Sequence, residues 1–366
     1  MDFRITGLKL HWGRIPVKLR FSYGRVDTFP FVIVRVSAGR AEGLGETGVL
    51  PDQLPEGFPE DYVPRFIGRD SRSLDALLPS QISDSVRIFC EGISMALHDL
   101  VGKLYGAPVH VLLGGKKRNS VPLMPCVFPF DPDDAAQTAR LFCERGFKRY
   151  MKVKLMGNLD EDLACVRKVR SVVPSQLVLQ GDANEGYQTI EEARRATESL
   201  GAAGLNIIED PLRGDVEEYC QLGKACRNGA RIMTDALARK TSDLVRVLAA
   251  GAADVIGVHP DQPGSLVTAL LHVKMARCFG VPVVLGGTGY TGVGVAAYQQ
   301  LTAVALEDGP SGELGGFNDH GMPESLITAA PHIERGCAQI SNLPGLGVTL
   351  DEEALARYQT GQRQWP

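Results

Sequence analysis

The sequence lacks long apolar runs, basic clusters and an export signal. Its longest apolar stretches are far below the roughly 18 residues that a membrane span needs, so we expect no transmembrane helix. The net charge is −4 and the longest run of basic residues is three, KKR at 116–118, which argues against nucleic acid as a partner. The first residues, MDFRITGLKLHWGR, contain no apolar core of the kind found in signal peptides.

Paired cysteine motifs are also absent. The chain has eight cysteines at irregular spacings and no CxxC sequence, which argues against a disulfide framework or a structural zinc site. Together with the missing export signal, this pattern is typical of reduced thiols. We therefore expect a cytoplasmic protein.

Short apolar runs recur through the middle of the chain, and most of them end in a charged residue. The runs are YMKVK, LVLQGD, LNIIED, RIMTD, DVIGVH and VPVVLGG, and their ends follow one another every 24 to 28 residues. Each is rich in Val, Ile and Leu, as expected of parallel strands buried on both faces. The period fits one strand, one helix and two short loops.

Helix-start chemistry occurs between these runs. An N-cap residue stands three positions before a glutamate in three pairs: Asn158 with Glu161, Thr189 with Glu192, and Asp215 with Glu218. Repeated strand–helix units of nearly constant period favour a closed barrel over a doubly wound sheet. We therefore predict an α/β fold built on a TIM barrel of the (β/α)7β type.

The chain is longer than the roughly 250 residues of a lone barrel, so we expect a second domain. Three parts are predicted: an N-terminal α+β capping domain at 1–120, the barrel at 121–332, and a C-terminal segment at 333–366 that returns to the cap. FRITGLKLHW and FPFVIVRVSA are interpreted as strands of the cap, RIPVKLRFSYGRVDT as the loop between them, and residues 80–105 as its helix.

The two ends of the barrel are harder to define. VPLMPCV from Val121 is interpreted as its first strand, followed by a helix over 133–145. An eighth strand is expected near Phe317, with Asp319 and His320 in a loop. PGLGVTLDEEALARY is interpreted as a turn, a short strand and a final helix.

Three acidic residues stand at the ends of consecutive predicted strands: Asp182, Glu209 and Asp235. Parallel barrel strands bring such residues to one mouth, where carboxylates would repel one another unless a cation neutralises them. An all-oxygen set suits a hard ion, Mg²⁺ before Mn²⁺ or Ca²⁺. Each acid could instead cap the next helix, but convergence of all three favours a metal site.

Two lysines in the first of these runs add a second functional element. Because side chains alternate along a strand, Lys152 and Lys154 point to one side and Val153 to the other. If Val153 faces the helix layer, both amines face the barrel interior, where one could act as a base. The alternative is a pair of surface lysines on an edge strand.

The chain resembles the enolase superfamily, in particular its mandelate racemase and muconate-lactonising members. The matching segments are KVK at 152–154, DAN from Asp182, EDP from Glu209, TD ending at Asp235, the stretch EGISMALHDLVGKLYGAPVHVLLGG, GLGE ending at Glu46 and PGLGVTLDEEAL. They follow the order of the family over nearly the whole chain.

This resemblance implies a Mg²⁺ held by the three acids, with Mn²⁺ as an alternative, and a small carboxylate substrate that loses its α-proton to form an enediolate. Lys154 would be the base on one face, and Lys152 would support the substrate charge. We also expect a homo-oligomer.

The sixth run departs from the family pattern. Muconate-lactonising relatives carry a second lysine there, and mandelate racemase relatives carry an aspartate paired with a histidine on the seventh strand; here the sixth run offers His259. An imidazole can transfer protons near neutral pH, so His259 and Lys154 on opposite faces would make a racemase or epimerase. His259 could instead expel a β-hydroxyl, only bind substrate, or have a purely structural role.

The capping loop and a glycine-rich turn are further candidates for substrate contact. Phe21, Tyr23 and Arg25 are predicted to lie in the loop that closes over the substrate, although for any single one of them a surface or inter-domain packing role is favoured, because loops expose most of their residues. Gly287 begins GGTGYTG, which spells GxGxxG with Gly289 and Gly292. A dehydrogenase is disfavoured because no further βαβ units follow; backbone binding of a substrate carboxylate or a simple turn fits better.

The function predicted from the sequence is a Mg²⁺-dependent racemase or epimerase acting on a carboxylate. Dehydration of a sugar, hydroxy or amino acid and cycloisomerisation are the alternatives, and a non-catalytic metal-binding barrel is a remote one. Two buried lysines argue against the last, because burying amines without a task is costly.

Overall fold

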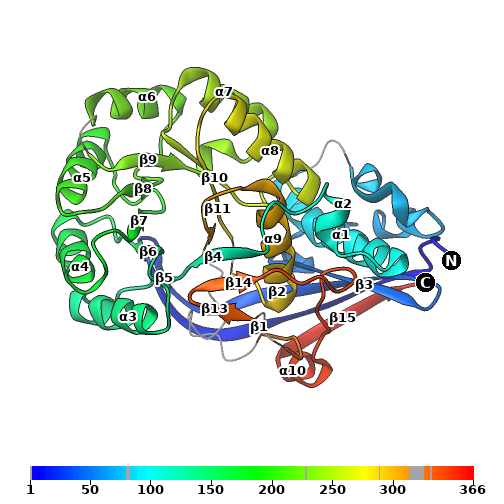
Figure 1. Cartoon of the computed structure of the whole chain (residues 1–366). Coiled ribbons are helices and arrows are strands. Elements are labelled where there is room, and N and C mark those ends of the chain that lie inside the picture. The colour runs from blue at the N-terminus through cyan, green and yellow to red at the C-terminus, as the bar shows by residue number, and fades with distance from the viewer. Residues whose placement is uncertain (1, 80–82, 227–228, 288, 313–324, 330–331) are drawn as a thin grey trace.

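The computed structural model describes residues 2–79, 83–226, 229–287, 289–312, 325–329 and 332–366. An antiparallel sheet and a curled parallel sheet lie side by side, with helices around the outside of the parallel sheet (Figure 1). The two termini lie close together, because Leu8 pairs with Trp365. The chain thus has a mixed α/β fold in two connected parts.

The antiparallel sheet has four strands in the order β15-β1-β2-β3. Their bounds are β1 Gly7–Phe21, β2 Gly24–Ala38, β3 Ala41–Thr47 and β15 Gln359–Trp365. Helix α1 (Asp84–Tyr105) covers one face and packs on β2 and β3. At Gly45 a Cβ atom would lie 1.9 Å from the carbonyl oxygen of Gly92, so this close approach of helix and strand requires glycine.

The first hairpin corrects the sequence-based prediction. The segment interpreted as a loop, RIPVKLRFSYGRVDT, forms the outer halves of β1 and β2, and only Ser22 and Tyr23 turn between them. Ile15, Val17 and Leu19 are buried in the same apolar core as the parallel sheet. Pro16 and Gly24 suggested a loop, but a register shift after Pro16 lets the strand continue.

Short helices and a C-terminal strand complete the first part. The short helices are η1 Pro51–Gln53, η2 Val63–Phe66, η3 Ser71–Leu77 and α2 Val109–Leu112. Near the C-terminus, α10 (Glu352–Tyr358) is followed by β15, which pairs with β1. The predicted final helix is confirmed, but the last strand follows that helix and was missed.

The parallel sheet contains the predicted apolar runs. Its strands are β5 Cys126–Val127, β6 Tyr150–Lys154, β7 Val178–Asp182, β8 Ile207–Glu209, β9 Arg231–Thr234, β10 Val255–Val258, β11 Val283–Leu285, β12 Ser311–Gly312 and β4 Ser120–Met124. Neighbours pair in parallel in that order, and β12 also pairs in parallel with β4. Only Pro125 separates β4, at one end of this strand order, from β5 at the other end. The two ends of the parallel sheet are therefore adjacent in the chain.

The chain after β12 was predicted to supply an eighth strand. The predicted eighth strand near Phe317 lies outside the described residues, as do Asp319 and His320. Strands β13 (Ile333–Glu334) and β14 (Cys337–Gln339) add an antiparallel extension on β4.

Helices connect successive parallel strands. They are α3 Pro132–Glu144, α4 Leu159–Val172, α5 Ile190–Ala202, α6 Val216–Ala225, η4 Ala236–Ala238, α7 Thr241–Ala250, α8 Leu266–Cys278 and α9 Gly292–Ala305. Thr189 and Asp215 form complete capping boxes, and Asn158 accepts from the backbone N–H of Glu161. All three predicted helix starts are therefore confirmed.

Buried polar contacts join the first part to the start of α9. The Glu46 carboxylate at the end of β3 accepts from the backbone N–H and hydroxyl of Thr291 and from the N–H of Gly294, at 2.7 to 2.8 Å. Glu91 on α1 accepts from the hydroxyls of Tyr290 and Tyr298. These bonds hold the antiparallel sheet β15-β1-β2-β3, which we call the capping sheet, and its helix α1 against the turn that follows β11.

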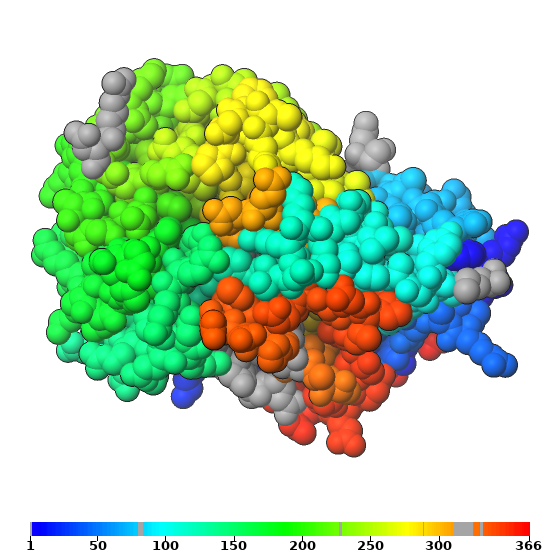
Figure 2. All heavy atoms as spheres, viewed as in Figure 1, coloured from blue at the N-terminus to red at the C-terminus, as the bar shows by residue number. Residues whose placement is uncertain are grey.

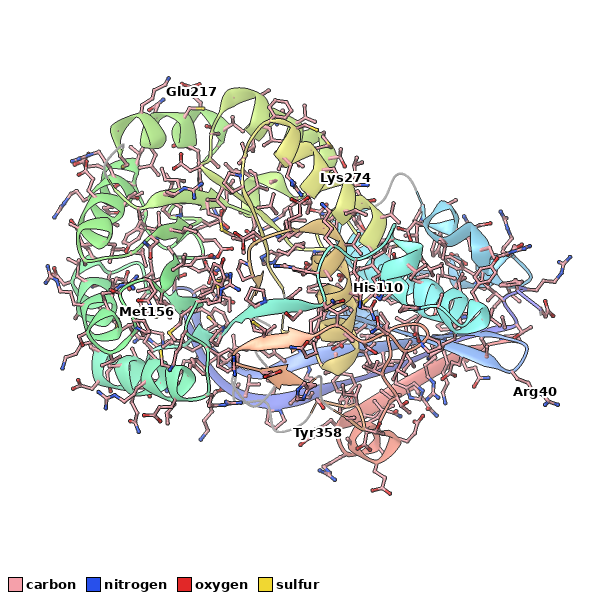
Figure 3. The ribbon with its side chains drawn as sticks, in the orientation of Figure 1. Arg40, His110, Met156, Glu217, Lys274 and Tyr358 are labelled. Carbon is pink, nitrogen blue, oxygen red and sulfur yellow. The ribbon has the colours of Figure 1, made fainter. Side chains whose placement is uncertain are left out.

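Side chains fill the space inside the curled sheet (Figure 3). In the space-filling view, the C-terminal residues lie along α1 and the capping sheet (Figure 2). Among the helices that the structure describes, none combines the length and the apolar character needed to cross a membrane.

Candidate active site

The parallel pairing brings the predicted functional residues together at one end of the sheet. The register places Lys154 beside Asp182 and Asp182 beside Glu209. Asp235 directly follows β9, and His259 directly follows β10. The sequence predicted this convergence from the strand ends alone.

Both lysines point into the sheet interior, as predicted. Lys152 is fully buried and Lys154 is 5% exposed, while Val153 between them belongs to the apolar core. The ammonium of Lys152 lies 2.6 Å from Oε2 of Glu209 and 3.5 Å from Oδ2 of Asp182. The ammonium of Lys154 lies 2.5 Å from the same Asp182 oxygen. These buried amines are therefore paired with carboxylates and are not surface lysines.

His259 lies across the mouth from the lysines, against Asp235. Its Nε2 atom is 3.1 Å from Oδ2 of Asp235 and 3.9 Å from Oε1 of Glu209. The imidazole passes so close to Gly286 that a Cβ atom there would lie 2.0 Å from Nε2. A glycine at the end of β11 thus makes room for the histidine on the neighbouring strand.

Asp210 is a buried acid that the sequence reasoning missed. Its Oδ1 atom accepts from the Thr234 hydroxyl at 2.7 Å and from the Asp235 N–H at 3.3 Å. Burial and the neighbouring charge of Asp235 raise the pKa of Asp210 well above its usual value. Burial alone would raise the pKa of Asp235, but His259 and Asp210 hold it well below its usual range.

The acidic cluster offers ligands for a divalent cation. One ligand atom each from Glu209, Asp235 and His259 lie within 4.8 Å of one another. Asp182 is not part of that group, although its carboxylate shares the Lys152 ammonium with Glu209. Carboxylate oxygens with a neighbouring imidazole fit Mg²⁺ or Mn²⁺ by their chemistry.

A cavity of about 170 Å³ opens onto these groups. Its lining comprises Phe21, Tyr23, Phe29, Phe128, Lys154, Asp182, Asn184, Asp235, His259, Gly287 and Gly289. We call it the catalytic cavity. Phe21, Tyr23 and Gly287 were predicted to contact substrate and do line it. Arg25 is not among its lining residues; its guanidinium lies 5.7 Å from the centre of the Phe130 ring.

Aromatic side chains form one wall of the catalytic cavity. The Phe21 ring meets the Phe128 ring edge-on, with centroids 5.3 Å apart, and stacks on Tyr23 at 5.0 Å. The Lys154 ammonium lies 5.0 Å from the Phe21 ring centre. The tip of the first hairpin therefore excludes water from the lysine while presenting an apolar surface to a ligand.

Asn184, at the end of the DAN motif, was also missed as a site residue. Its side-chain oxygen accepts from the Lys154 ammonium at 3.2 Å, and its N–H donates to Oδ1 of Asp182 at 2.9 Å. Its carbonyl accepts from the Ser22 hydroxyl at the hairpin tip. The backbone is left-handed, with φ +44°, which asparagine tolerates better than most residues. Its position two residues after Asp182 was the available signal.

A capping sheet over a curled parallel sheet, with amines and carboxylates at the strand ends, defines the class of enolase-like enzymes. Residues 133–354 match the family model described as "Enolase C-terminal domain-like", and residues 5–114 match "Mandelate racemase / muconate lactonizing enzyme, N-terminal domain". The chain therefore belongs to the mandelate racemase and muconate lactonizing enzyme family of the enolase superfamily, as the sequence motifs indicated.

Named proteins are similar in sequence to this chain over nearly its whole length. Muconate cycloisomerase 1 of Pseudomonas putida is 28% identical over 360 residues, covering 94% of each protein. N-succinyl-L-Arg/Lys racemase of Bacillus cereus is 23% identical over 372 residues, covering 96% of this chain and 97% of the relative. Other relatives include dehydratases, so isomerases and lyases both occur among them.

A solved structure shares the same fold. The muconate lactonizing enzyme of Pseudomonas fluorescens, in complex with muconolactone, superimposes with a TM-score of 0.89. The match covers 98% of this chain and 100% of that chain at 24% sequence identity. At this identity the likeness supports the fold.

Proposed function

We propose that this enzyme removes the α-proton of a carboxylate substrate and returns a proton to the opposite face, which makes it a racemase or epimerase. The observation that carries the proposal is the opposed placement of two proton-transfer groups in one cavity. Lys154 stands on β6 and His259 follows β10, and β7, β8 and β9 lie between them in the sheet. A substrate between them can be reached from both faces.

Lys154 is proposed as the base on one face. The neutral amine would take the α-proton at Nζ, and Asp182 and Asn184, 2.5 and 3.2 Å away, would hold the resulting ammonium in place. The Phe21 ring centre lies 5.0 Å from this Nζ atom and forms the apolar wall beside it. Lys152 would stabilise the negative charge of the substrate carboxylate.

His259 is proposed as the acid on the other face. Its Nε2 atom would deliver a proton to carbon, and the Asp235 carboxylate 3.1 Å away would stabilise the charged imidazolium before transfer. Gly286 leaves the ring room to occupy this position.

Asp182, Glu209 and Asp235 are proposed as the carboxylate ligands of Mg²⁺, or of Mn²⁺ in its place. Such a cation supplies positive charge beside the carboxylate oxygens on which the enediolate charge develops. Ligand atoms of Glu209, Asp235 and His259 lie within 4.8 Å of one another, which supports a cation site. Asp182 lies beside this site, because the Lys152 ammonium contacts both Asp182 and Glu209.

We also propose that the parallel sheet is a (β/α)7β TIM barrel at 121–332, capped by an α+β domain at 1–120 and a returning segment at 333–366. The return of strand pairing to β4 and the pairing of β15 with β1 support this division. A homo-oligomeric assembly stays a prediction.

A dehydratase is the second candidate, because an acid at the His259 position could also expel a β-hydroxyl as water. Cycloisomerisation is a further alternative, because it would use the same enediolate intermediate. A racemase changes only the configuration of its substrate, whereas a dehydratase changes its mass. Chiral chromatography and mass spectrometry of the same reaction mixture therefore distinguish them.

The test is α-proton exchange. A panel of carboxylic acids is incubated with the enzyme and Mg²⁺ in D₂O, and deuterium at the α-carbon is followed by NMR. Exchange should stop with EDTA. In Lys154→Ala it should stop for the enantiomer whose α-proton faces Lys154, and it should persist for both enantiomers in Lys168→Ala, a matched change at an exposed lysine on α4. No exchange across a broad panel would favour a binding protein without catalysis.

A further inference from the structure

A cavity of about 280 Å³ lies between helix α9 and the segment that follows β14 (Figure 1). We call it the α9 pocket. It shares no lining residue with the catalytic cavity, so the two are separate. Its volume is close to the roughly 300 Å³ at which ligand pockets begin, which suits a molecule of about one ring.

Hydrogen bonds fix the walls of the α9 pocket. The side-chain amide of Gln300 on α9 donates to the carbonyl oxygens of Ser341 and Leu346, both at 3.4 Å. The Leu346 N–H in turn donates to the buried Asp99 carboxylate of α1 at 2.7 Å. Helix and segment are therefore held apart at a set distance by the protein's own contacts, as is usual for small-molecule sites.

Gln299, the next residue on α9, supplies an unsatisfied polar group. It lines the pocket and only 4% of its surface is exposed. Within the part of the chain that the structure describes, its side-chain amide forms no hydrogen bond, whereas both ends of the Gln300 amide are bonded. Burying an amide without a partner costs free energy, because the lost bonds to water are not replaced. A ligand that bonds Gln299 would offset this cost.

The lining of the α9 pocket defines the chemistry of such a ligand. The described residues that form it include no Asp, Glu, Lys or Arg. Its remaining polar side chains and its larger apolar ones are Gln339, Ser341 and His332, and Ile340, Leu346 and Val348. An ion would lose its hydration here without gaining an opposite charge, so a neutral ligand is favoured. A primary amide offers a donor beside an acceptor, which matches the same pair on another amide.

We propose that the α9 pocket binds a small neutral molecule with an amide or lactam edge on an apolar body, and that Gln299 recognises this edge. The ligand N–H would donate to Oε1 of Gln299, and its carbonyl would accept from Nε2. The apolar body would lie against Ile340, Leu346 and Val348. The proposal is independent of the proposed function, because the pocket contains none of the strand-end residues.

The experiment uses three molecules of nearly the same shape that differ in charge: neutral benzamide, benzoate and benzamidinium. Binding is followed by NMR of methyl-labelled protein at pH 8, where an imidazole is ordinarily neutral. The methyl groups of Ile340, Leu346 and Val348 report on the α9 pocket, because the described lining of the catalytic cavity contains no Ile, Leu or Val. We expect benzamide to shift these signals with a Kd of about a millimolar or below. Both ions should bind at least about five-fold more weakly.

Two substitutions at Gln299 test the recognition step. Gln299→Leu keeps the size of the side chain but removes its donor and acceptor, so benzamide should bind at least about five-fold more weakly. Gln299→Glu adds a negative charge, so benzamidinium should become the preferred ligand. The same two changes at Gln221, which is exposed on α6, are matched controls and should leave all three titrations unchanged. Unshifted methyl signals outside the pocket show that each variant folds.

Three results would overturn the α9 pocket as an amide site. The first is the absence of methyl shifts at benzamide concentrations far above a millimolar. The second is equal affinity for the three molecules in the wild type. The third is unaltered benzamide affinity in folded Gln299→Leu. If that variant does not fold, the preference of Gln299→Glu decides, and if neither folds, the order of the three molecules in the wild type decides.

Discussion

Adding one methyl group at Gly286 should displace the His259 side chain and so prevent its proton transfer, although residue 259 stays a histidine. An ideal Cβ at this position would lie 2.0 Å from Nε2 and 2.3 Å from Cδ2 of the imidazole. The backbone cannot easily retreat, because the Gly286 N–H donates to the carbonyl oxygen of Val258 at 3.0 Å. In Gly286→Ala the ring must therefore leave its place beside Asp235.

The expected magnitude follows from the lost proton transfer. A positioned general acid or base contributes about 10²- to 10⁴-fold, which corresponds to about 3 to 5 kcal/mol in the barrier. Racemisation should fall by that factor. Exchange of the α-proton on the Lys154 side should continue, because Lys154 and Asp182 lie on other strands. The packing strain should lower the free energy of unfolding by about 1 to 3 kcal/mol.

The assay compares both enantiomers of one active acid in D₂O. Deuterium at the α-carbon is followed by NMR, and optical rotation reports inversion. We expect Gly286→Ala to exchange one enantiomer at nearly the wild-type rate while inversion is lost. Gly223→Ala is the matched control: it lies in α6 with nothing within 4 Å of an added Cβ, and it should stabilise the helix slightly.

Two results would refute this reasoning. Inversion at the wild-type rate in Gly286→Ala would mean that His259 carries no essential proton. Equal loss of exchange for both enantiomers, in a variant that is folded at the assay temperature, would mean that His259 and Lys154 do not serve separate faces.

Three further predictions concern the surroundings of the site. Burial raises the pKa of Glu46 from 4.5 to about 7, so this carboxyl ionises at a lower pH in the unfolded chain than in the folded protein. The free energy of unfolding should therefore fall by about 3 kcal/mol as the pH rises from about 4.5 to 7. Urea titrations of the wild type should show this fall, and those of Glu46→Gln should not. Asn184→Gly keeps a backbone with φ +44° but removes the acceptor of the Lys154 ammonium, so kcat should fall about ten-fold with little change in the melting temperature. Mg²⁺ at about 100 times its Kd should stabilise the fold by about 2.7 kcal/mol in thermal shift assays; EDTA should reverse this gain and Asp235→Asn should reduce it.

The regular part of the fold could be predicted because its signals are local. Each buried strand gives an uninterrupted apolar run, and the capping residues Asn158, Thr189 and Asp215 mark helix starts within three positions of their partners. The lysines, the acids and His259 could be placed for the same reason, because each ends such a strand. Strand direction then decides where these side chains meet.

The first hairpin and the last strand could not be predicted with the same ease, because tertiary pairing determines them. In β1, buried Ile15, Val17 and Leu19 alternate with exposed positions, but Pro16 is a poor strand residue on local grounds. The sequence QTGQRQW of β15 has little apolar character and becomes a strand only because β1 offers it an edge. Both segments acquire their structure from a partner distant in the sequence.

The same distinction explains the site residues that were missed. Asp210 and Asn184 each follow a predicted ligand, but their roles depend on contacts from other elements: Thr234 for the first and Ser22 for the second. Strand ends indicate where chemistry can gather, whereas selectivity comes from loops whose positions the local sequence does not specify.

The hairpin tip connects the capping sheet directly to the amine at the reaction centre. Arg20 pairs with Glu161 at 2.6 Å and the Ser22 hydroxyl donates to the Asn184 carbonyl, so two contacts fix the tip to the first turn of α4 and to the loop after β7. Phe21 between them is thereby held against Lys154. Because one short segment supplies the aromatic wall and also touches the residue that orients the lysine, a change at the tip alters ligand fit and base position together. Variation in the capping hairpin can therefore change substrate preference and turnover at once, with no substitution among the strand-end residues.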